Sequence, residues 1–329
     1  MKVFLCRDFN SSFYHVSARL HRDLESLYYL MGIDVTTNEE QSFDFAHFVD
    51  ISQKSKILYV KERLKKKVIL NYFVNKKKNN SLENSYLIPF EDKRILNKVD
   101  LIIVSCQADK MTLILNDIKT NIEIMTPSVK EERFTKINEL EKNSFFQYAG
   151  LLKNEEFALA VVNYKNYQDI CDLISLSEKL PEISFFVFGP KIKFSTPRKI
   201  KSLIKKAPRN IKFKTIINED LFKSAMLLSK FYIVTRESEG EVITILEAMI
   251  TKTQLFTFNT HLNGDVLKDN VNCILSNNTD QMKENIVNYL NGKISTLDEA
   301  YKYAKECNYL NSSQNLKSIL DQYIDFSKE

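Results

Sequence analysis

The 329-residue sequence contains only six glycines, no tryptophan, and no Cys-x-x-Cys pair among its five cysteines. An odd number of widely spaced cysteines is not the pattern of a disulfide-stabilised secreted domain or of a cysteine-rich zinc site. Scarce glycine also leaves few places where a glycine-rich loop could bring backbone amides up to a phosphate. We therefore expect no disulfide framework, no metal site, and a reducing, cytoplasmic location.

Long apolar runs are missing as well. No stretch of the sequence reaches the roughly 20 apolar residues that a membrane-spanning helix needs, and the N-terminal segment lacks the apolar core of a signal peptide. The composition is otherwise that of a folded chain, with 44% hydrophobic and 27% charged residues, which excludes a mainly disordered protein. We expect a soluble or peripheral protein of about two domains, at roughly 150 residues per domain.

Apolar runs alternate with amphipathic segments through most of the sequence. The runs at Lys2–Cys6, Val68–Val74 and Leu101–Ser105 have the uninterrupted apolar character of strands that are covered on both faces. In other segments apolar residues recur at spacings of three and four, which is typical of helices. This alternation predicts an α/β fold of two Rossmann-like, doubly wound domains facing a central cleft, where ligands of such sheets usually bind.

A charged segment with little apolar periodicity, residues 126–143, separates two alternating regions. We expect an N-terminal domain over residues 1–140 and a C-terminal domain over residues 141–310. A last helix, over residues 311–329, is expected to pack back towards the first domain. The second domain is predicted to begin with a strand at Phe145–Ala149.

The segment of most chemical interest is an acidic loop that follows an apolar strand and leads into a helix. Its acidic and flexible residues are Glu237, Glu239, Gly240, Glu241 and, within the helix, Glu247. Carboxylates accept hydrogen bonds from hydroxyl groups, and a helix N-terminus can receive a phosphate. The pattern fits a sugar or nucleotide site, but it equally fits an ordinary acidic first turn that favours the helix dipole.

This segment resembles the Glu-x7-Glu signature of the family-4 retaining glycosyltransferases, which have the two-domain GT-B fold. Glu239 and Glu247 have the spacing of that signature, and residues 246–249 resemble its Leu-Glu-Ala-Met context. The resemblance implies that Glu239 holds hydroxyls of the donor sugar in catalysis and that Glu247 holds the nucleotide ribose. It also implies retention of the anomeric configuration, with no metal and no cofactor other than the nucleotide-sugar substrate.

Weaker similarity extends over most of the chain, and its layout is most similar to the bacterial enzymes that glucosylate diacylglycerol. The resemblance implies a nucleotide-sugar donor, UDP-glucose or UDP-galactose, and a membrane-associated lipid or a saccharide as acceptor. Further candidates on the donor side are Gly240, Glu241, Val242, Lys153, Lys165 and Gly189. The candidates on the acceptor side are Ser11, Ser12 and His47, of which His47 also suits a buried position at a strand end.

Three departures from the family pattern concern donor binding. The glycine loop of the first domain is replaced by Asn10-Ser11-Ser12, a turn histidine is missing from residues 70–73, and the compact basic cluster after Gly150 is reduced to scattered lysines. Two of these lysines, Lys153 and Lys165, remain as point charges for a diphosphate. The alternative function is therefore a degenerate GT-B protein that binds a sugar nucleotide or a partner glycosyltransferase without turnover.

Basic residues are concentrated in two segments, although the formal net charge is only +5. Residues 61–78 are rich in lysine, and residues 191–214 contain ten basic residues and no acidic one. Each such charge can gain about 1 kcal/mol near anionic lipid, so the segments predict contact with the inner face of the cell membrane. Solvated lysine faces are the alternative, and nucleic acid is not expected because no recognised module is present.

Overall fold

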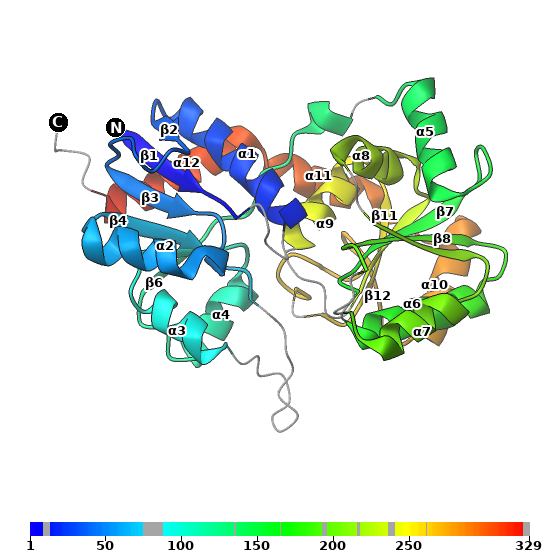
Figure 1. Cartoon of the computed structure of the whole chain (residues 1–329). Helices are drawn as coiled ribbons and strands as arrows, with labels where there is room; N and C mark the ends of the chain where they lie inside the picture. The colour runs from blue at the N-terminus through cyan, green and yellow to red at the C-terminus, as the bar shows by residue number, and fades with distance from the viewer. Residues whose placement is uncertain are drawn as a thin grey trace. The chain divides into compact units, whose positions relative to one another are not determined.

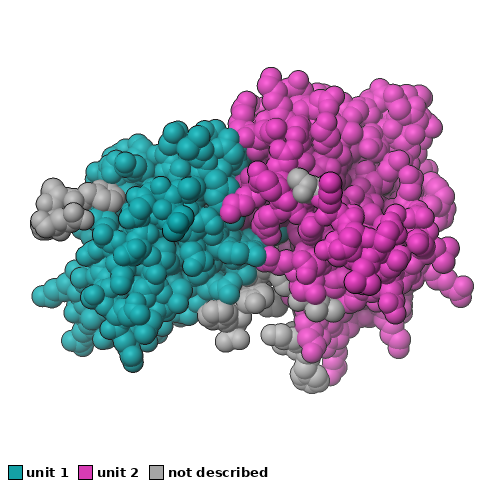
Figure 2. All heavy atoms as spheres, turned by 90° about the horizontal axis from the view of Figure 1, so that it is seen from above, with its two compact units in different colours: residues 1–128, 307–329 teal, residues 129–306 magenta. Residues whose placement is uncertain are grey.

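The computed structural model shows two compact units. Unit 1 comprises Met1–Ser128 together with Cys307–Glu329, and unit 2 comprises Val129–Glu306 (Figure 2). The sequence analysis placed these divisions after residues 140 and 310 instead. The structure describes residues 1–8, 14–74, 88–134, 136–164, 166–192, 196–215, 218–235, 241–260 and 262–324.

Unit 1 is built on a parallel sheet with the strand order β2-β1-β3-β4-β5-β6. Its strands are β1 (Lys2–Cys6), β2 (Asp34–Thr36), β3 (Phe45–Phe48), β4 (Lys67–Asn71), β5 (Leu101–Val104) and β6 (Asn121–Ile124). Strands β3 and β5 are buried along their whole length. The apolar runs of the sequence are thus strands covered on both faces, as their composition predicts.

Helices cover both faces of this sheet (Figure 1). One face carries η1 (Ile51–Gln53), α2 (Lys54–Leu58), the π-helical η2 (Tyr59–Arg63), α3 (Phe90–Leu96) and α4 (Gln107–Leu115). On the other face α1 (Tyr14–Leu30) and α12 (Tyr309–Tyr323) lie side by side. The Tyr323 hydroxyl donates to Glu123 Oε1 at 2.7 Å, so the last turn of α12 is bound into unit 1.

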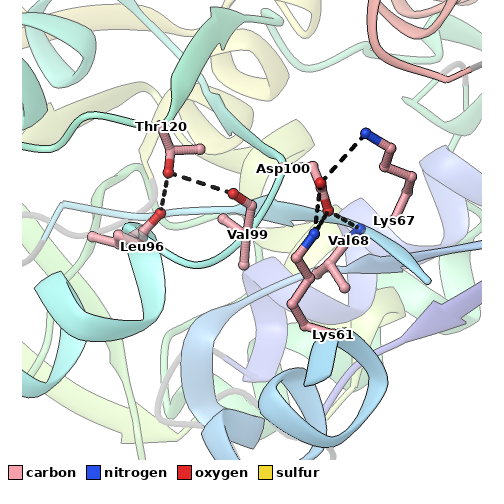
Figure 3. Close-up of polar contacts among 7 residues, drawn as sticks. All are labelled: Lys61, Lys67, Val68, Leu96, Val99, Asp100 and Thr120. Carbon is pink, nitrogen blue, oxygen red and sulfur yellow. Dashed lines mark hydrogen bonds and ion pairs between the residues drawn. The ribbon is translucent and has the colours of Figure 1, made fainter. Parts of the chain in front are cut away.

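A charged cluster around Asp100 holds the amino edge of the unit 1 sheet (Figure 3). Lys61 Nζ donates to both Asp100 oxygens at 2.6 and 2.7 Å, and the backbone N–H of Val68 donates to Oδ2 at 2.8 Å. Lys67 Nζ lies farther away, 3.6 Å from Oδ1. Lys61, from the lysine-rich segment of the sequence, is therefore engaged within unit 1.

Unit 2 contains a second parallel sheet with the strand order β12-β11-β10-β7-β8-β9. Its strands are β7 (Phe157–Val161), β8 (Ser184–Gly189), β9 (Ile211–Thr215), β10 (Phe231–Val234), β11 (Gln254–Phe258) and β12 (Ile274–Ser276). Strands β10 and β11 are buried throughout, which places the core of the unit around them.

The helices of unit 2 also form two layers (Figure 1). One layer is α6 (Tyr167–Lys179), α7 (Arg198–Lys206) and α10 (Thr279–Leu290). The other is α5 (Glu139–Ala149), α8 (Glu219–Leu228), α9 (Glu241–Ile250) and α11 (Leu297–Glu306), with the short turn η3 (Glu131–Phe134) beside α8. None of the helices in the described parts of the chain is both long and apolar enough to cross a bilayer.

Residues 145–149, predicted as the first strand of the second domain, form the end of helix α5, so that prediction is wrong. Asn138 Oδ1 accepts from the Glu141 N–H at 2.8 Å, and Glu141 Oε2 accepts from the Asn138 N–H at 2.8 Å, which makes a capping box. Gly150 ends the helix at φ 69°, in the left-handed region that suits glycine. The first strand of the sheet is β7.

Candidate functional site

The candidate site of unit 2 lies where the strand order of its sheet reverses. From β7 the chain moves outward through β8 and β9 and then returns to place β10 on the other side of β7. Ligands of open parallel sheets bind at such a switch point, beside the carboxyl ends of the strands. Helix α6 begins after β7 and helix α9 begins after β10, so two helix N-termini lie at this point.

Helix α9 carries the second glutamate of the Glu-x7-Glu pattern. Glu247 is only 2% exposed there, and the helix packs against β11 and α11. Glu241 begins the helix, and Val242 in its first turn is buried. A carboxylate at this depth is held in one place by its surroundings, as a ligand-binding acid must be. Glu239 and Gly240 lie outside the described residues.

Asp169 and Thr235 connect the two sides of the switch point. Asp169 lies in the first turn of α6 and is fully buried, and its Oδ2 accepts a hydrogen bond from Thr235 Oγ1 at 3.0 Å. Asn166 Nδ2 donates to the same oxygen at 3.4 Å. Thr235 directly follows β10, so this contact holds the start of the acidic loop. The sequence analysis missed Asp169, because an acid in a first helical turn is common; the available signal was its place at the start of the first helix after a buried strand.

Gly189 ends β8 and packs against Tyr164. A Cβ atom at position 189 would lie 2.4 Å from the Tyr164 ring, which is closer than real side chains approach. Tyr164 is itself buried, and its hydroxyl lies 2.9 Å from the carbonyl oxygen of Val187 and 2.6 Å from that of Lys214. Close packing therefore accounts for the glycine, and its contact with a donor stays a prediction.

Of the two lysines predicted to meet the donor diphosphate, the structure describes only Lys153. Lys153 lies in the loop before β7, at the amino edge of the sheet, with its Nζ 3.8 Å from Glu139. The five residues of β7 separate the amino and carboxyl edges by about 16 Å, so the structure does not bring Lys153 to the switch point. Lys165 lies outside the described residues.

On the acceptor side, His47 is a fully buried residue of β3 in unit 1. The Tyr28 hydroxyl lies 2.7 Å from its Nδ1, and Asn71 Oδ1 lies 3.2 Å from its Nε2, so both ring nitrogens have partners in the core. Burial lowers the pKa of His47 to about 4, which keeps the ring neutral at physiological pH. Ser11 and Ser12 lie outside the described residues.

Buried thiols and acidic clusters offer no second chemistry in the described part of the chain. Burial raises the pKa of Cys6 to about 11 and that of Cys273 to about 12, so both remain thiols rather than nucleophilic thiolates. Within the described ranges, no three His, Cys, Asp or Glu side chains come together as a metal site. The switch point of unit 2 is therefore the site that the geometry favours.

Comparison with known proteins identifies the type of domain that unit 2 forms. Residues 142–307 match the family described as glycosyl transferases group 1, a range that contains every strand of the unit 2 sheet. The processive diacylglycerol alpha-glucosyltransferase of Acholeplasma laidlawii is 20% identical over 322 residues, which cover 96% of this chain and 94% of that protein.

Solved structures have a similar fold over nearly the whole chain. Anabaena HepE, crystallised in complex with UDP and glucose, gives a TM-score of 0.70 at 13% identity and covers 98% of this chain and 100% of its own. Sucrose-phosphate synthase from Thermosynechococcus elongatus gives a TM-score of 0.64 at 13% identity and covers 93% of this chain and 78% of its own. With two parallel, Rossmann-like sheets of the GT-B type and a family match over half its length, the chain belongs to the glycosyl transferases group 1 family.

Proposed function

We propose that the protein is a retaining glycosyltransferase that moves a hexose from UDP-glucose or UDP-galactose to a membrane-associated acceptor such as diacylglycerol. The observation that carries this proposal is the position of Glu247, buried on α9 beside the switch point of unit 2. Its spacing from Glu239 is that of the Glu-x7-Glu signature. Retention of configuration comes from the family resemblance and not from this spacing.

In the proposed mechanism the chain orients the donor and stabilises the leaving diphosphate. Glu239 orients hydroxyls of the sugar, and Glu247 holds the ribose. Backbone N–H groups at the start of α9, near Val242, meet the diphosphate, because a helix N-terminus carries partial positive charge. Lys165 is the remaining lysine for the phosphates, since Lys153 lies at the opposite edge of the sheet.

Two comparisons support the choice of donor and acceptor. The relative from Acholeplasma laidlawii is named as a diacylglycerol glucosyltransferase, and the Anabaena structure was solved with UDP and glucose. Both similarities extend over more than nine-tenths of this chain. Transfer of glucose to diacylglycerol is therefore the first reaction to test, with UDP-galactose as the second donor.

The basic segment at residues 191–214 supports a membrane-facing surface on unit 2. Helix α7 buries Ile200 and exposes most of its basic residues, and strand β9 lies at the edge of the sheet. Lys205, Lys206 and Arg209 are exposed, and in the described part of the chain none of them is paired with an acid. In the other basic segment Lys61 is bound to Asp100, and residues 75–78 lie outside the described residues, so we propose the membrane contact on α7 and β9.

The alternative is a degenerate GT-B protein that binds a nucleotide sugar or a partner enzyme without turnover. The observation that favours it is the position of Lys153, because one of the two predicted phosphate ligands is absent from the switch point. Both functions require nucleotide binding in unit 2, and only the first requires transfer.

Calorimetric titration with UDP and with GDP tests the shared requirement. We expect UDP to bind more tightly than GDP and the substitution Glu247→Gln to weaken UDP binding about tenfold, since a ribose hydroxyl would lose its charged acceptor. Glu156→Gln is the matched control, because Glu156 pairs with Lys230 at the amino edge of the same sheet. Equal affinity of the wild type and Glu247→Gln for UDP would contradict the assignment of Glu247.

A further inference from the structure

A small pocket lies at the carboxyl edge of the unit 1 sheet, where β4, β5 and β6 end. It has room for a group about the size of one water molecule. Asn71 lines it from the end of β4, and the apolar residues that line it include Leu20, Phe73, Ile103, Met125 and Pro127. No charged side chain lines the pocket among the described residues.

The side chain of Asn71 is buried and only half satisfied. Asn71 is 3% exposed, and its Oδ1 lies 3.2 Å from His47 Nε2, but its Nδ2 has no hydrogen-bond partner within the described ranges. Buried N–H groups are nearly always paired in folded proteins, because an unpaired one has lost its bonds to water without replacement. The amide nitrogen of Asn71 is therefore a buried hydrogen-bond donor without an acceptor among the described residues.

A chain of three side chains fixes which way this amide points. The Tyr28 hydroxyl is fully buried, and its one hydrogen-bond partner among the described residues is His47 Nδ1, at 2.7 Å. Tyr28 must donate there to satisfy its proton, which puts the proton of the neutral His47 ring on Nε2. That N–H donates to Asn71 Oδ1. The opposite amide orientation would break this sequence of donors and acceptors, so Nδ2 is the polar atom of this side chain that is left without a partner.

We propose that Asn71 binds a hydroxyl or carbonyl oxygen of a substrate in this pocket, with His47 and Tyr28 as positioning residues. Mostly apolar walls, with Ser105 as a further polar lining residue, and an amide donor suit a neutral oxygen-bearing group, whereas a phosphate would need positive charge. The proposed function supplies this chemistry from two sources, the glycerol part of a lipid acceptor and the hexose of the donor. The inference rests on that function for the choice of these two ligands.

Nuclear magnetic resonance of the full-length, 15N-labelled chain tests the contact without requiring turnover. The side-chain amide signals of Asn71 are identified by their loss in Asn71→Asp, or by their displacement in Asn71→Gln if the first variant does not fold. One arm titrates dioctanoylglycerol and the other titrates UDP-glucose. We expect the Asn71 signals to shift in one arm, which identifies the source of the oxygen, and Asn71→Asp to weaken that ligand about tenfold.

Three further variants separate binding from simple loss of structure. Thr120→Val perturbs the amino edge of the same sheet, where Thr120 Oγ1 donates to the Leu96 carbonyl at 2.7 Å, and should titrate like the wild type. His47→Leu should abolish the shift by freeing the amide to rotate, whereas His47→Gln, which keeps an N–H donor, should restore it.

Two results overturn the inference: no shift of the Asn71 signals in either arm, which would mean that the pocket holds only water, or unchanged affinity of Asn71→Asp for the shifting ligand. Failure of the proposed function is distinguishable, because it appears as absent glycolipid formation from UDP-glucose and diacylglycerol, whereas the Asn71 signals report binding without turnover.

Discussion

The imidazole of His47 links the acidity of the solution to the stability of the unit 1 core. Burial lowers its pKa to about 4 in the folded chain, from 6.5 in the absence of burial. Between these values the unfolded chain binds a proton that the folded chain excludes. The free energy of unfolding should therefore fall as the pH is lowered from 6.5 to about 4, by up to roughly 3 kcal/mol, and this group should cause no further loss below that range.

Urea unfolding measured at steps from pH 7 to pH 4 checks this dependence. The variant His47→Gln cannot titrate, so its stability should change less over the same range than that of the wild type. Parallel pH profiles for the two proteins would show that His47 does not have the lowered pKa.

Gly189 is the other residue whose identity the packing decides. Gly189→Ala would place a methyl group 2.4 Å from the Tyr164 ring, so we expect a loss of about 2 kcal/mol in the free energy of unfolding. Thermal or urea unfolding measures this loss. If the clash is its cause, Gly189→Ala should cost much less in a Tyr164→Leu background than in the wild type; purely additive effects of the two substitutions would exclude the clash.

At the scale of elements, the Asp100 cluster ties η2 to the first residues of β4 and β5 (Figure 3). Asp100→Ala removes the acceptor for Lys61 and for the Val68 N–H, so we expect the free energy of unfolding to fall by about 2 kcal/mol. Lys67→Ala is the matched control, because Lys67 is more exposed and 3.6 Å from Asp100, and it should change stability by less than about 0.5 kcal/mol. Equal effects in chemical denaturation would contradict a specific role for Lys61 and Val68.

Elements whose signals are local were predictable from the sequence, and one element whose signal is ambiguous was not. The strand at residues 2–6 has the bounds that its apolar run predicted. The run at residues 145–149 is short and apolar, which fits a strand or a buried helix equally. Its helical state depends on the capping box at Asn138 and on Gly150, which lie at the two ends of the helix rather than within the run.

At the same scale, we predict that the charged surface of α7 and β9 binds anionic membranes. Reversing Lys205, Lys206 and Arg209 to Glu should weaken binding to vesicles containing phosphatidylglycerol by at least about tenfold, because each lost charge contributes about 1 kcal/mol. Vesicle co-sedimentation measures the change. A matched control reverses three exposed lysines elsewhere on unit 2, Lys283, Lys293 and Lys302, and alters the net charge equally. Similar losses in both triple variants would reduce the effect to net charge alone.

At the scale of the whole molecule, the two doubly wound sheets were predictable because apolar runs typical of strands alternate with amphipathic segments typical of helices along the sequence. The candidate site was predictable only in part. Glu247 belongs to a local pattern, whereas Asp169 meets Thr235 from 66 positions away and only the folded sheet brings them together. The proposed role of Asn71 likewise depends on its contact with His47 and on the pocket formed by the neighbouring strand ends. Pairings of this kind leave no periodic trace in a single sequence.

Direct detection of the glycolipid product tests whether the chain transfers a hexose. Labelled UDP-glucose is incubated with vesicles containing diacylglycerol and phosphatidylglycerol, and the glycolipid formed is counted for the wild type, Glu239→Ala, Glu247→Ala and Glu237→Ala. Glu237 lies in the same acidic loop but outside the Glu-x7-Glu spacing, so its variant is the matched control.

We expect labelled glycolipid from the wild type and from Glu237→Ala, and a loss of at least about a hundredfold in Glu239→Ala and Glu247→Ala. No glycolipid from the wild type with either UDP-glucose or UDP-galactose, in protein that still binds UDP, would contradict transfer and assign the chain to the non-catalytic members of the fold.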